Sequence, residues 1–168
     1  MNREFSAGGA VFKNVDGKTL WLVTKAKPSD LFPRETWRLP KGWLDDINQG
    51  MSPGPLGSGK TKATPEEIQQ AAIREVEEEG GVKVVIVTKL KTDTIFYTRN
   101  GDKVMKFITY FLMEWAEDLP QGFGMETEET TWLEFDEAHK KLTHTREKAI
   151  LKKANESLET LKKQSSLV

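Results

Sequence analysis

The pattern of apolar and polar residues predicts strands and helices that follow one another along the chain. Residues 5–12 (FSAGGAVF) and 19–24 (TLWLVT) indicate two strands of a hairpin, joined by a turn at residues 14–17 (NVDG). The glycine pair at residues 8–9 is typical of a strand that another backbone or a ligand approaches closely. Residues 37–40 (WRLP) are expected to be extended, because a residue before proline avoids the helical conformation.

A helix is strongly marked between Thr64 and Gly80. Thr64 is a good N-cap residue, and Pro65 suits the first helical position. Gly80 and Gly81 mark the end, because many helices end at a glycine in the left-handed conformation.

The second half of the chain predicts more strands and then two helices. Strands are expected over residues 82–87, 92–98, 104–115 and 131–135, and the first of these is apolar and β-branched, as in a buried strand. Asp136 is predicted to cap a short helix through Leu142, and Thr145 to begin a long helix that reaches about Lys163. This order predicts an α/β fold with helices on both sides of a mixed sheet.

Length and composition limit the possible functions. The chain of 168 residues has the size of one domain, and its net charge of −1 indicates neither a broad nucleic-acid surface nor a membrane surface. The absence of cysteine excludes disulfides and thiolate metal sites. Because no long apolar run occurs, we expect a soluble, cytoplasmic protein.

Residues 49–62 carry no periodic pattern and are rich in Gly, Pro, Ser and Lys, which predicts a flexible loop. Residues 54–61 (GPLGSGKT) satisfy the phosphate-loop expression, but a true phosphate loop follows directly on a buried strand, and none is indicated here. The favoured interpretation is a solvated loop. A mobile loop that brings Lys60 or Lys62 to substrate phosphates is the next, and a nucleotide-binding phosphate loop is the last.

The predicted helix carries an acidic face near its end. Glu75, Glu78 and Glu79 stand at positions i, i+3 and i+4, so their carboxylates share one side. Like charges at this spacing repel by roughly 0.2–0.5 kcal/mol per pair, and the negative end of the helix dipole adds to the cost. A divalent cation would reverse these costs, whereas an exposed charge run is the alternative.

Residues 74–82 (REVEEEGGV) resemble the signature helix of Nudix hydrolases. The family's pattern is Gly, five residues, Glu, seven residues, then Arg-Glu-aliphatic-x-Glu-Glu-x-Gly-aliphatic, and its second half matches at every fixed position. Glu66 also stands at the expected distance before Arg74. The matching glycine is Gly42 in WRLPKG, but Asn48 stands where the pattern has its first Glu. We interpret residues 49–63 as an inserted flexible loop within a single Nudix domain, residues 1–168.

The resemblance implies the Nudix α/β/α sandwich and a site for Mg²⁺ (or Mn²⁺). The implied ligands are Glu75, Glu78, Glu79 and a backbone carbonyl near Gly42, all oxygen donors that suit a hard cation. Arg74 is expected to hold a neighbouring carboxylate in place.

Some relatives in the family take a further glutamate from the region before the last strand as general base or as an additional metal ligand, and here we favour Glu128. Arg34, Lys41 and Lys106 are candidates to neutralise phosphates, and Tyr97 is a candidate to stack on a base. For each of these residues, a surface or core position without a functional role is the competing interpretation.

The resemblance implies metal-dependent hydrolysis of a phosphoanhydride by water. The motifs most resemble Nudix enzymes that act on diadenosine polyphosphates and diphosphoinositol polyphosphates, with nucleoside triphosphates or capped RNA as further alternatives. A nucleotide-sensing domain on the same fold would have lost a signature carboxylate, and none is lost here.

Overall fold

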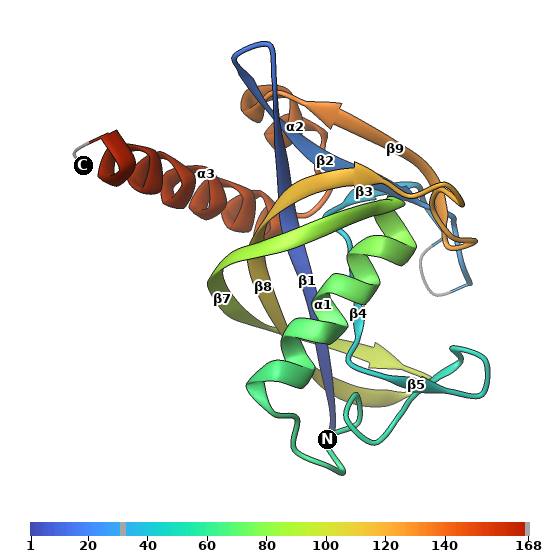
Figure 1. Cartoon of the computed structure of the whole chain (residues 1–168). Helices are drawn as coiled ribbons and strands as arrows, with labels where there is room; N and C mark the ends of the chain where they lie inside the picture. The colour runs from blue at the N-terminus through green and yellow to red at the C-terminus, as the bar shows by residue number, and fades with distance from the viewer. Residues whose placement is uncertain (31–32, 167–168) are drawn as a thin grey trace.

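A computed structural model of the chain describes residues 1–30 and 33–166, and it forms a mixed sheet with helices on both faces (Figure 1). Residues 31–32 and 167–168 of the predicted domain lie outside the described residues. The strands are β1 (Asn2–Val15), β2 (Lys18–Ala26), β3 (Thr36–Arg38), β4 (Lys41–Trp43), β5 (Asp46–Ile47), β6 (Ser52–Pro53), β7 (Val82–Arg99), β8 (Asp102–Asp118) and β9 (Thr127–Leu133). The helices are α1 (Pro65–Gly80), α2 (Phe135–Lys141) and α3 (Thr145–Ser166).

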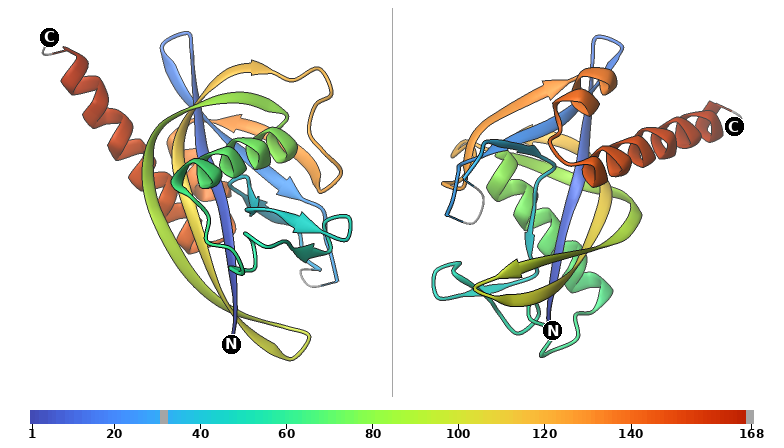
Figure 2. Two further views of the ribbon diagram at one scale, coloured as in Figure 1. Left: turned by 60° about the horizontal axis from the view of Figure 1, so that its bottom comes forward. Right: turned by 180° about the vertical axis from the view of Figure 1, so that it is seen from behind.

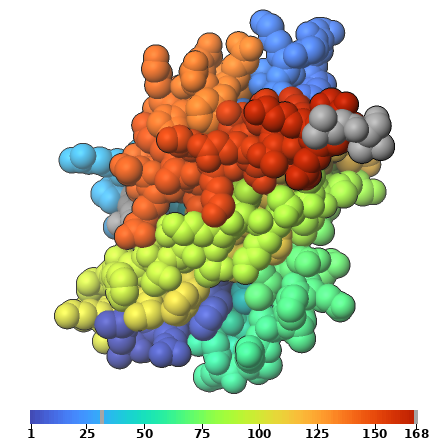
Figure 3. All heavy atoms as spheres, turned by 90° about the vertical axis from the view of Figure 1, so that its left-hand side faces the viewer, coloured from blue at the N-terminus to red at the C-terminus, as the bar shows by residue number. Residues whose placement is uncertain are grey.

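The central sheet has the order β3-β2-β1-β8-β7, and β4 and β9 pair with β1 and β2 respectively. The pairing of β1 with β8 is parallel, whereas β7 with β8 and β1 with β2 are antiparallel, so the sheet is mixed. Helix α1 covers one face, and α2 and α3 cover the other (Figure 2), which confirms the predicted α/β/α sandwich. Figure 3 shows α3 lying against β7.

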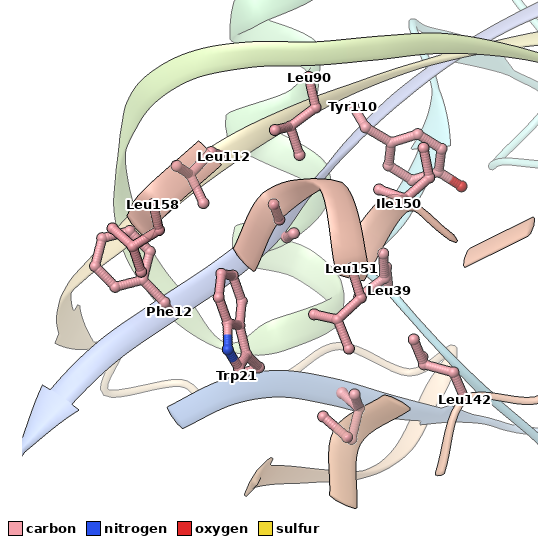
Figure 4. Packing of buried hydrophobic residues seen from close by; sticks show 14 of the residues in the cluster. Phe12, Trp21, Leu39, Leu90, Tyr110, Leu112, Leu142, Ile150, Leu151 and Leu158 are labelled. Carbon is pink, nitrogen blue, oxygen red and sulfur yellow. The ribbon is translucent and has the colours of Figure 1, made fainter. Parts of the chain in front are cut away.

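Two hydrophobic cores fill the spaces between the sheet and its helices. Strand alternation along β8 sends Phe111 and Met113 to the core under α1, and Tyr110 and Leu112 to the core under α2 and α3. The second core is built around Trp21 (Figure 4). Among the described residues, no helix is both long and apolar enough to cross a membrane.

Helix α1 begins and ends as its sequence predicts. The Thr64 hydroxyl accepts a hydrogen bond from the Glu67 amide at 3.1 Å, and the Glu67 carboxylate accepts one from the Thr64 amide at 3.0 Å. This capping box satisfies two amide groups that a helix start otherwise leaves unpaired. At the other end Gly81 has a φ of 69°, the left-handed conformation that favours glycine.

Two predicted boundaries are wrong. The two strands expected over 82–98 form one continuous strand, β7, whose three register shifts bend it so that it stays paired with β8. The first part of β7 is buried on one side only, because Val85 and Val87 point to solvent. Helix α2 begins at Phe135 after an N-cap at Glu134, so Asp136 lies in the first turn rather than capping the helix.

The segment expected to be a flexible loop is tied into the structure. The carboxylate of Asp45 accepts hydrogen bonds from the amides of Leu56 and Gly57, at 3.1 and 2.7 Å. The Phe5 amide in turn donates to the Gly57 carbonyl at 2.8 Å. In the phosphate-loop-like sequence, backbone amides that would bind a phosphate therefore bind an internal carboxylate, and a two-residue strand precedes it. The phosphate-loop interpretation is wrong, and Lys60 and Lys62 are exposed.

The glycine pair of β1 does mark a close approach of another backbone. A Cβ atom on Gly8 would lie 2.2 Å from the Pro40 carbonyl oxygen, whereas one on Gly9 would meet the flexible side chain of Met113. We expect Gly8→Ala to lower the free energy of unfolding by about 3 kcal/mol in urea denaturation, because a backbone cannot yield cheaply to an overpacked atom. Gly9→Ala is the matched control, and equal losses in the two variants would contradict this explanation.

Candidate active site

The end of α1 brings two buried carboxylates to the edge of a cleft. Glu75 is 6% exposed and Glu79 is 8% exposed, whereas the side chain of Glu78 is 60% exposed. Burial raises the pKa of both Glu75 and Glu79 to about 7, and it also raises the pKa of Glu78. Such carboxylates are costly to ionise unless a cation joins them.

Arg74 connects this acidic helix end to β4. One guanidinium nitrogen lies 3.0 Å from Glu75 Oε1, and another lies 3.7 Å from Glu78 Oε1. The same side chain donates hydrogen bonds to the carbonyls of Trp43 and Leu44, at 2.9 and 3.3 Å. The structure therefore places Arg74 where it can hold Glu75 against β4, in the orienting position that the sequence predicts.

The backbone of β4 passes directly over the two buried carboxylates. A Cβ atom on Gly42 would lie 2.1 Å from Glu75 Oε2, so any larger residue here would displace that carboxylate. The Lys41 amide lies 3.4 Å from Glu79 Oε2. Gly42 thus stands beside the carboxylates with which it is predicted to share a cation.

The oxygen atoms around Glu75, Glu79 and Gly42 suit a metal site that the protein closes only in part. Across residues 1–30 and 33–166, no three acidic or histidine side chains already surround a common point. Mg²⁺ is typically held by one or two carboxylates and keeps waters or substrate phosphates as its remaining ligands. Two buried carboxylates with raised pKa values, next to an exposed third one, suit such a partly open site rather than a closed protein cage.

These groups border a cavity of about 730 Å³, which we call the acidic cavity. Carboxylates and cations both face it. The acidic lining residues are Asp46, Glu75, Glu78, Glu79 and Glu126, and the basic ones are Lys27, Arg38, Lys41 and Lys106. The carboxylates would suit a divalent cation, and the basic side chains would suit the oxygens of a phosphate chain.

Two of the three predicted phosphate-binding residues lie in this cavity. Lys106 is half-buried, and desolvation together with the nearby charge of Lys41 lowers its pKa to about 8. Arg34 is exposed and lies outside the lining of the acidic cavity, so the structure does not bring it to the site. Arg38 lines the cavity instead, although the sequence alone gave no reason to choose it over other basic residues.

The acidic loop before β9 contributes Glu126 rather than Glu128. Glu128 lies in a bulge between the pairs Lys25–Glu129 and Ala26–Thr127, and its carboxylate lies 3.6 Å from the Lys25 ammonium. Glu126 reaches the acidic cavity because the Gly124 amide and the Thr127 hydroxyl bind the last carbonyls of α1, at 2.6 and 2.8 Å. The structure therefore places Glu126, rather than the predicted Glu128, in the lining of the acidic cavity.

Tyr97 lines a second cavity of about 660 Å³, which we call the side cavity. It opens beside the acidic cavity, and the two share Ser29, Arg38, Lys41, Trp43 and Lys106 in their linings. The Tyr97 hydroxyl donates to Glu4 Oε1 at 2.6 Å, and desolvation raises its pKa to about 12. Only its ring is therefore available to a ligand, as the predicted stacking role requires.

Comparison with known proteins agrees with this geometry. The profile of the NUDIX domain matches residues 4–154. A protein of Mycobacterium tuberculosis provisionally named mutator protein MutT4 is 26% identical over 159 residues, which cover 94% of this chain and 57% of that protein. The chain thus spans little more than half the length of this relative.

Solved structures show the same fold. The Ap4A hydrolase of C. elegans, in a binary complex, has a TM-score of 0.65 and 22% identity, covering 94% of this chain and 98% of its own. The Nudix hydrolase RenU of M. smegmatis has a TM-score of 0.63 and 21% identity. The match covers 95% of this chain and 88% of RenU. Because the profile match spans most of the chain and includes the acidic helix and Gly42, the chain belongs to the Nudix family.

Proposed function

We propose that this Nudix hydrolase is a divalent-metal-dependent pyrophosphohydrolase that cleaves a phosphoanhydride in a dinucleoside polyphosphate or a diphosphoinositol polyphosphate. One observation carries the proposal: buried carboxylates and a group of cations face each other across one cavity. Nudix hydrolases generally use divalent metal ions and act on small molecules. The three carboxylates in the second half of the signature, Glu75, Glu78 and Glu79, are all present.

The residues of the site have two roles in phosphoanhydride hydrolysis, metal binding and phosphate binding. Glu75, Glu78, Glu79 and the backbone near Gly42 would hold Mg²⁺ or Mn²⁺, which when bound lowers the pKa of a water and shields charge at phosphorus. Arg38, Lys41 and Lys106 would bind and orient the phosphate chain.

Water attack forms one P–O bond and breaks the anhydride P–O bond, and the leaving phosphate departs with the electron pair. A carboxylate must accept the proton of the attacking water. Glu126 is the glutamate of the acidic cavity that is left for this role, because Glu75, Glu78 and Glu79 are assigned to the metal.

The choice of substrate rests on likeness in sequence and fold. The sequence motifs resemble those of enzymes acting on diadenosine and diphosphoinositol polyphosphates. The C. elegans structure with a TM-score of 0.65 is an Ap4A hydrolase, which supports the first of these classes.

A screen of phosphate release tests the proposal. Dinucleoside polyphosphates, nucleotide sugars, nucleoside triphosphates and inositol pyrophosphates would each be incubated with the protein in Mg²⁺ and in EDTA, with a phosphatase added where the products retain terminal phosphates. We expect turnover of at least one dinucleoside polyphosphate or inositol pyrophosphate, and only when the divalent cation is present. Lys60→Ala should leave this turnover unchanged, since Lys60 is exposed and lines neither cavity. Undiminished turnover in EDTA would overturn the proposed mechanism.

A further inference from the structure

The floor of the side cavity is one face of the β7–β8 pair. Asp93, Ile95, Tyr97 and Arg99 alternate along β7, and they stand opposite Ile108, Lys106, Val104 and Asp102 of β8. Strand alternation places every second residue of each strand on the same face, so the β7 set lines the cavity together with Lys106, Ile108 and Tyr110. Helix α3 closes this floor with Arg146 and Glu147.

Most of the cations that line the side cavity are already neutralised within the protein. Arg99 forms an ion pair with the buried carboxylate of Glu4, and Arg146 lies 3.3 Å from Asp93. Lys41 lies 3.6 Å from Glu147. Among the described residues, only the lining cations Arg38 and Lys106 have no ion pair, and both also border the acidic cavity. A ligand that carries many phosphate groups would therefore find few unpaired cations in the rest of the side cavity.

Tyr110 presents an unpaired hydroxyl to the cavity. The residue is 2% exposed, lines the cavity, and has no hydrogen-bond partner for its hydroxyl among the described residues. Figure 4 shows that this hydroxyl points away from the hydrophobic cluster into which the ring packs. Desolvation raises the pKa of Tyr110 well above its ordinary value, and the nearby charges of Glu147 and Asp93 act in the same direction. Among the described residues, the buried side-chain atoms without a partner are Ser6 Oγ and Trp21 Nε1, so the Tyr110 hydroxyl faces the open cavity and is free to donate to a ligand there.

The carboxylates beside Tyr110 have unused capacity to accept hydrogen bonds. Glu147 is 4% exposed, and its Oε1 accepts from the Leu39 amide at 2.6 Å while its Oε2 faces Lys41. Asp93 contacts Arg146 and Lys91 through Oδ1 only. An ionised carboxylate offers about four lone-pair sites and no donor, so both groups prefer ligands that carry N–H groups.

We propose that the side cavity binds the nucleobase of a nucleotide substrate and selects a base with an exocyclic amino group through Tyr110, Glu147 and Asp93. This inference rests on the proposed function and decides between its two substrate classes in favour of the nucleotide. The rings of Tyr97 and Trp43 line the same cavity and offer stacking surfaces. The volume of about 660 Å³ lies within the usual range of ligand pockets, about 300–1,000 Å³. The phosphate chain would then leave the base past Arg38 and Lys106 toward the carboxylates of α1.

Binding measured without catalysis separates this inference from the proposed function. Calorimetric titrations in EDTA would compare AMP, purine riboside 5′-monophosphate, which lacks only the amino group, and inositol hexakisphosphate. We expect AMP to bind about tenfold or more tightly than the amino-free nucleotide, because carboxylate hydrogen bonds are lost with the amino group. Inositol hexakisphosphate is expected to bind more weakly than AMP.

Tyr110→Phe tests the hydroxyl while keeping the ring in the core. We expect this variant to bind AMP about tenfold more weakly and inorganic pyrophosphate as the wild type does, with an unchanged melting temperature. Tyr97→Phe is the matched control and should keep the preference for the amino group, because its hydroxyl is already bound to Glu4.

Equal binding of AMP and the amino-free nucleotide, or unchanged AMP binding by Tyr110→Phe, would overturn the inference. If AMP fails to bind but inositol pyrophosphates are hydrolysed in Mg²⁺, the inference fails and the proposed function stands. If AMP binds with the expected preference but no phosphoanhydride is cleaved, the proposed function fails and the base site stands.

Discussion

Replacement of Glu79 by glutamine will lower kcat by roughly 10²–10⁴-fold and will also stabilise the metal-free protein, since proton-transfer and metal-holding groups contribute on this scale. Both effects follow from one observation. Glu79 is a buried carboxylate whose pKa desolvation raises to about 7, so its charge is costly to the fold without a cation. Glutamine keeps the shape of the side chain and removes the charge.

The effect on stability has a definite pH dependence. The pKa of Glu79 is about 7 in the folded chain and 4.5 as its ordinary value, so the folded state binds the proton more tightly than the unfolded state. Stability therefore falls as pH rises from about 4.5 to 7, and it is lowest above 7. Because one pKa unit corresponds to about 1.4 kcal/mol, the cost from Glu79 reaches about 3 kcal/mol at high pH.

Thermal unfolding followed by circular dichroism between pH 4.5 and 8 checks this expectation. In EDTA the melting temperature of the wild type should fall with pH, and that of Glu79→Gln should fall less. Added Mg²⁺ should raise the wild-type melting temperature most at pH 8, since the cation binds the ionised carboxylates. Glu77→Gln on the same helix lines neither cavity and serves as the control for both kcat and melting. Wild-type turnover by Glu79→Gln would refute the assignment of Glu79.

The parts of the fold and site that the sequence predicts correctly depend on local rules. The start of α1 at Thr64, its end at Gly80 and the shared face of Glu75 and Glu79 follow from capping and helical spacing alone. The alternation along β8 and the close approach at Gly8 follow from strand geometry in the same way.

The residues that the sequence misses depend on how distant segments meet. The sequence does not distinguish Glu126 from Glu128, because both are glutamates of the same acidic segment. The bulge opposite Lys25 and the anchoring of the loop to α1 decide which of the two side chains reaches the cavity. Arg38 and Tyr110 acquire a possible role only because β3, β8 and α3 border one space. The phosphate-loop expression failed for a similar reason, since the carboxylate that occupies it comes from Asp45, outside the motif.

Gly42→Ala is expected to lower kcat/KM by about 10²-fold while changing stability little. The new Cβ atom would lie 2.1 Å from Glu75 Oε2, which is the end of a flexible side chain rather than backbone. The carboxylate can rotate away at small cost to the fold, but it then leaves the position at which it is assigned to hold the metal. A misplacement of about 1 Å at an active site can cost about 10²-fold in rate.

A double-mutant cycle with Glu75→Ala distinguishes this explanation from a general weakening of β4. If Gly42 matters because it leaves room for the Glu75 carboxylate, then Gly42→Ala should cause almost no further loss of kcat/KM in a protein that already lacks that carboxylate. The melting temperature of Gly42→Ala should stay near that of the wild type, unlike that of Gly8→Ala, where the new atom would meet the Pro40 backbone. Additive losses of activity from Gly42→Ala and Glu75→Ala would show that Gly42 acts through something other than Glu75, and the coupling between β4 and the acidic helix would have to be given up.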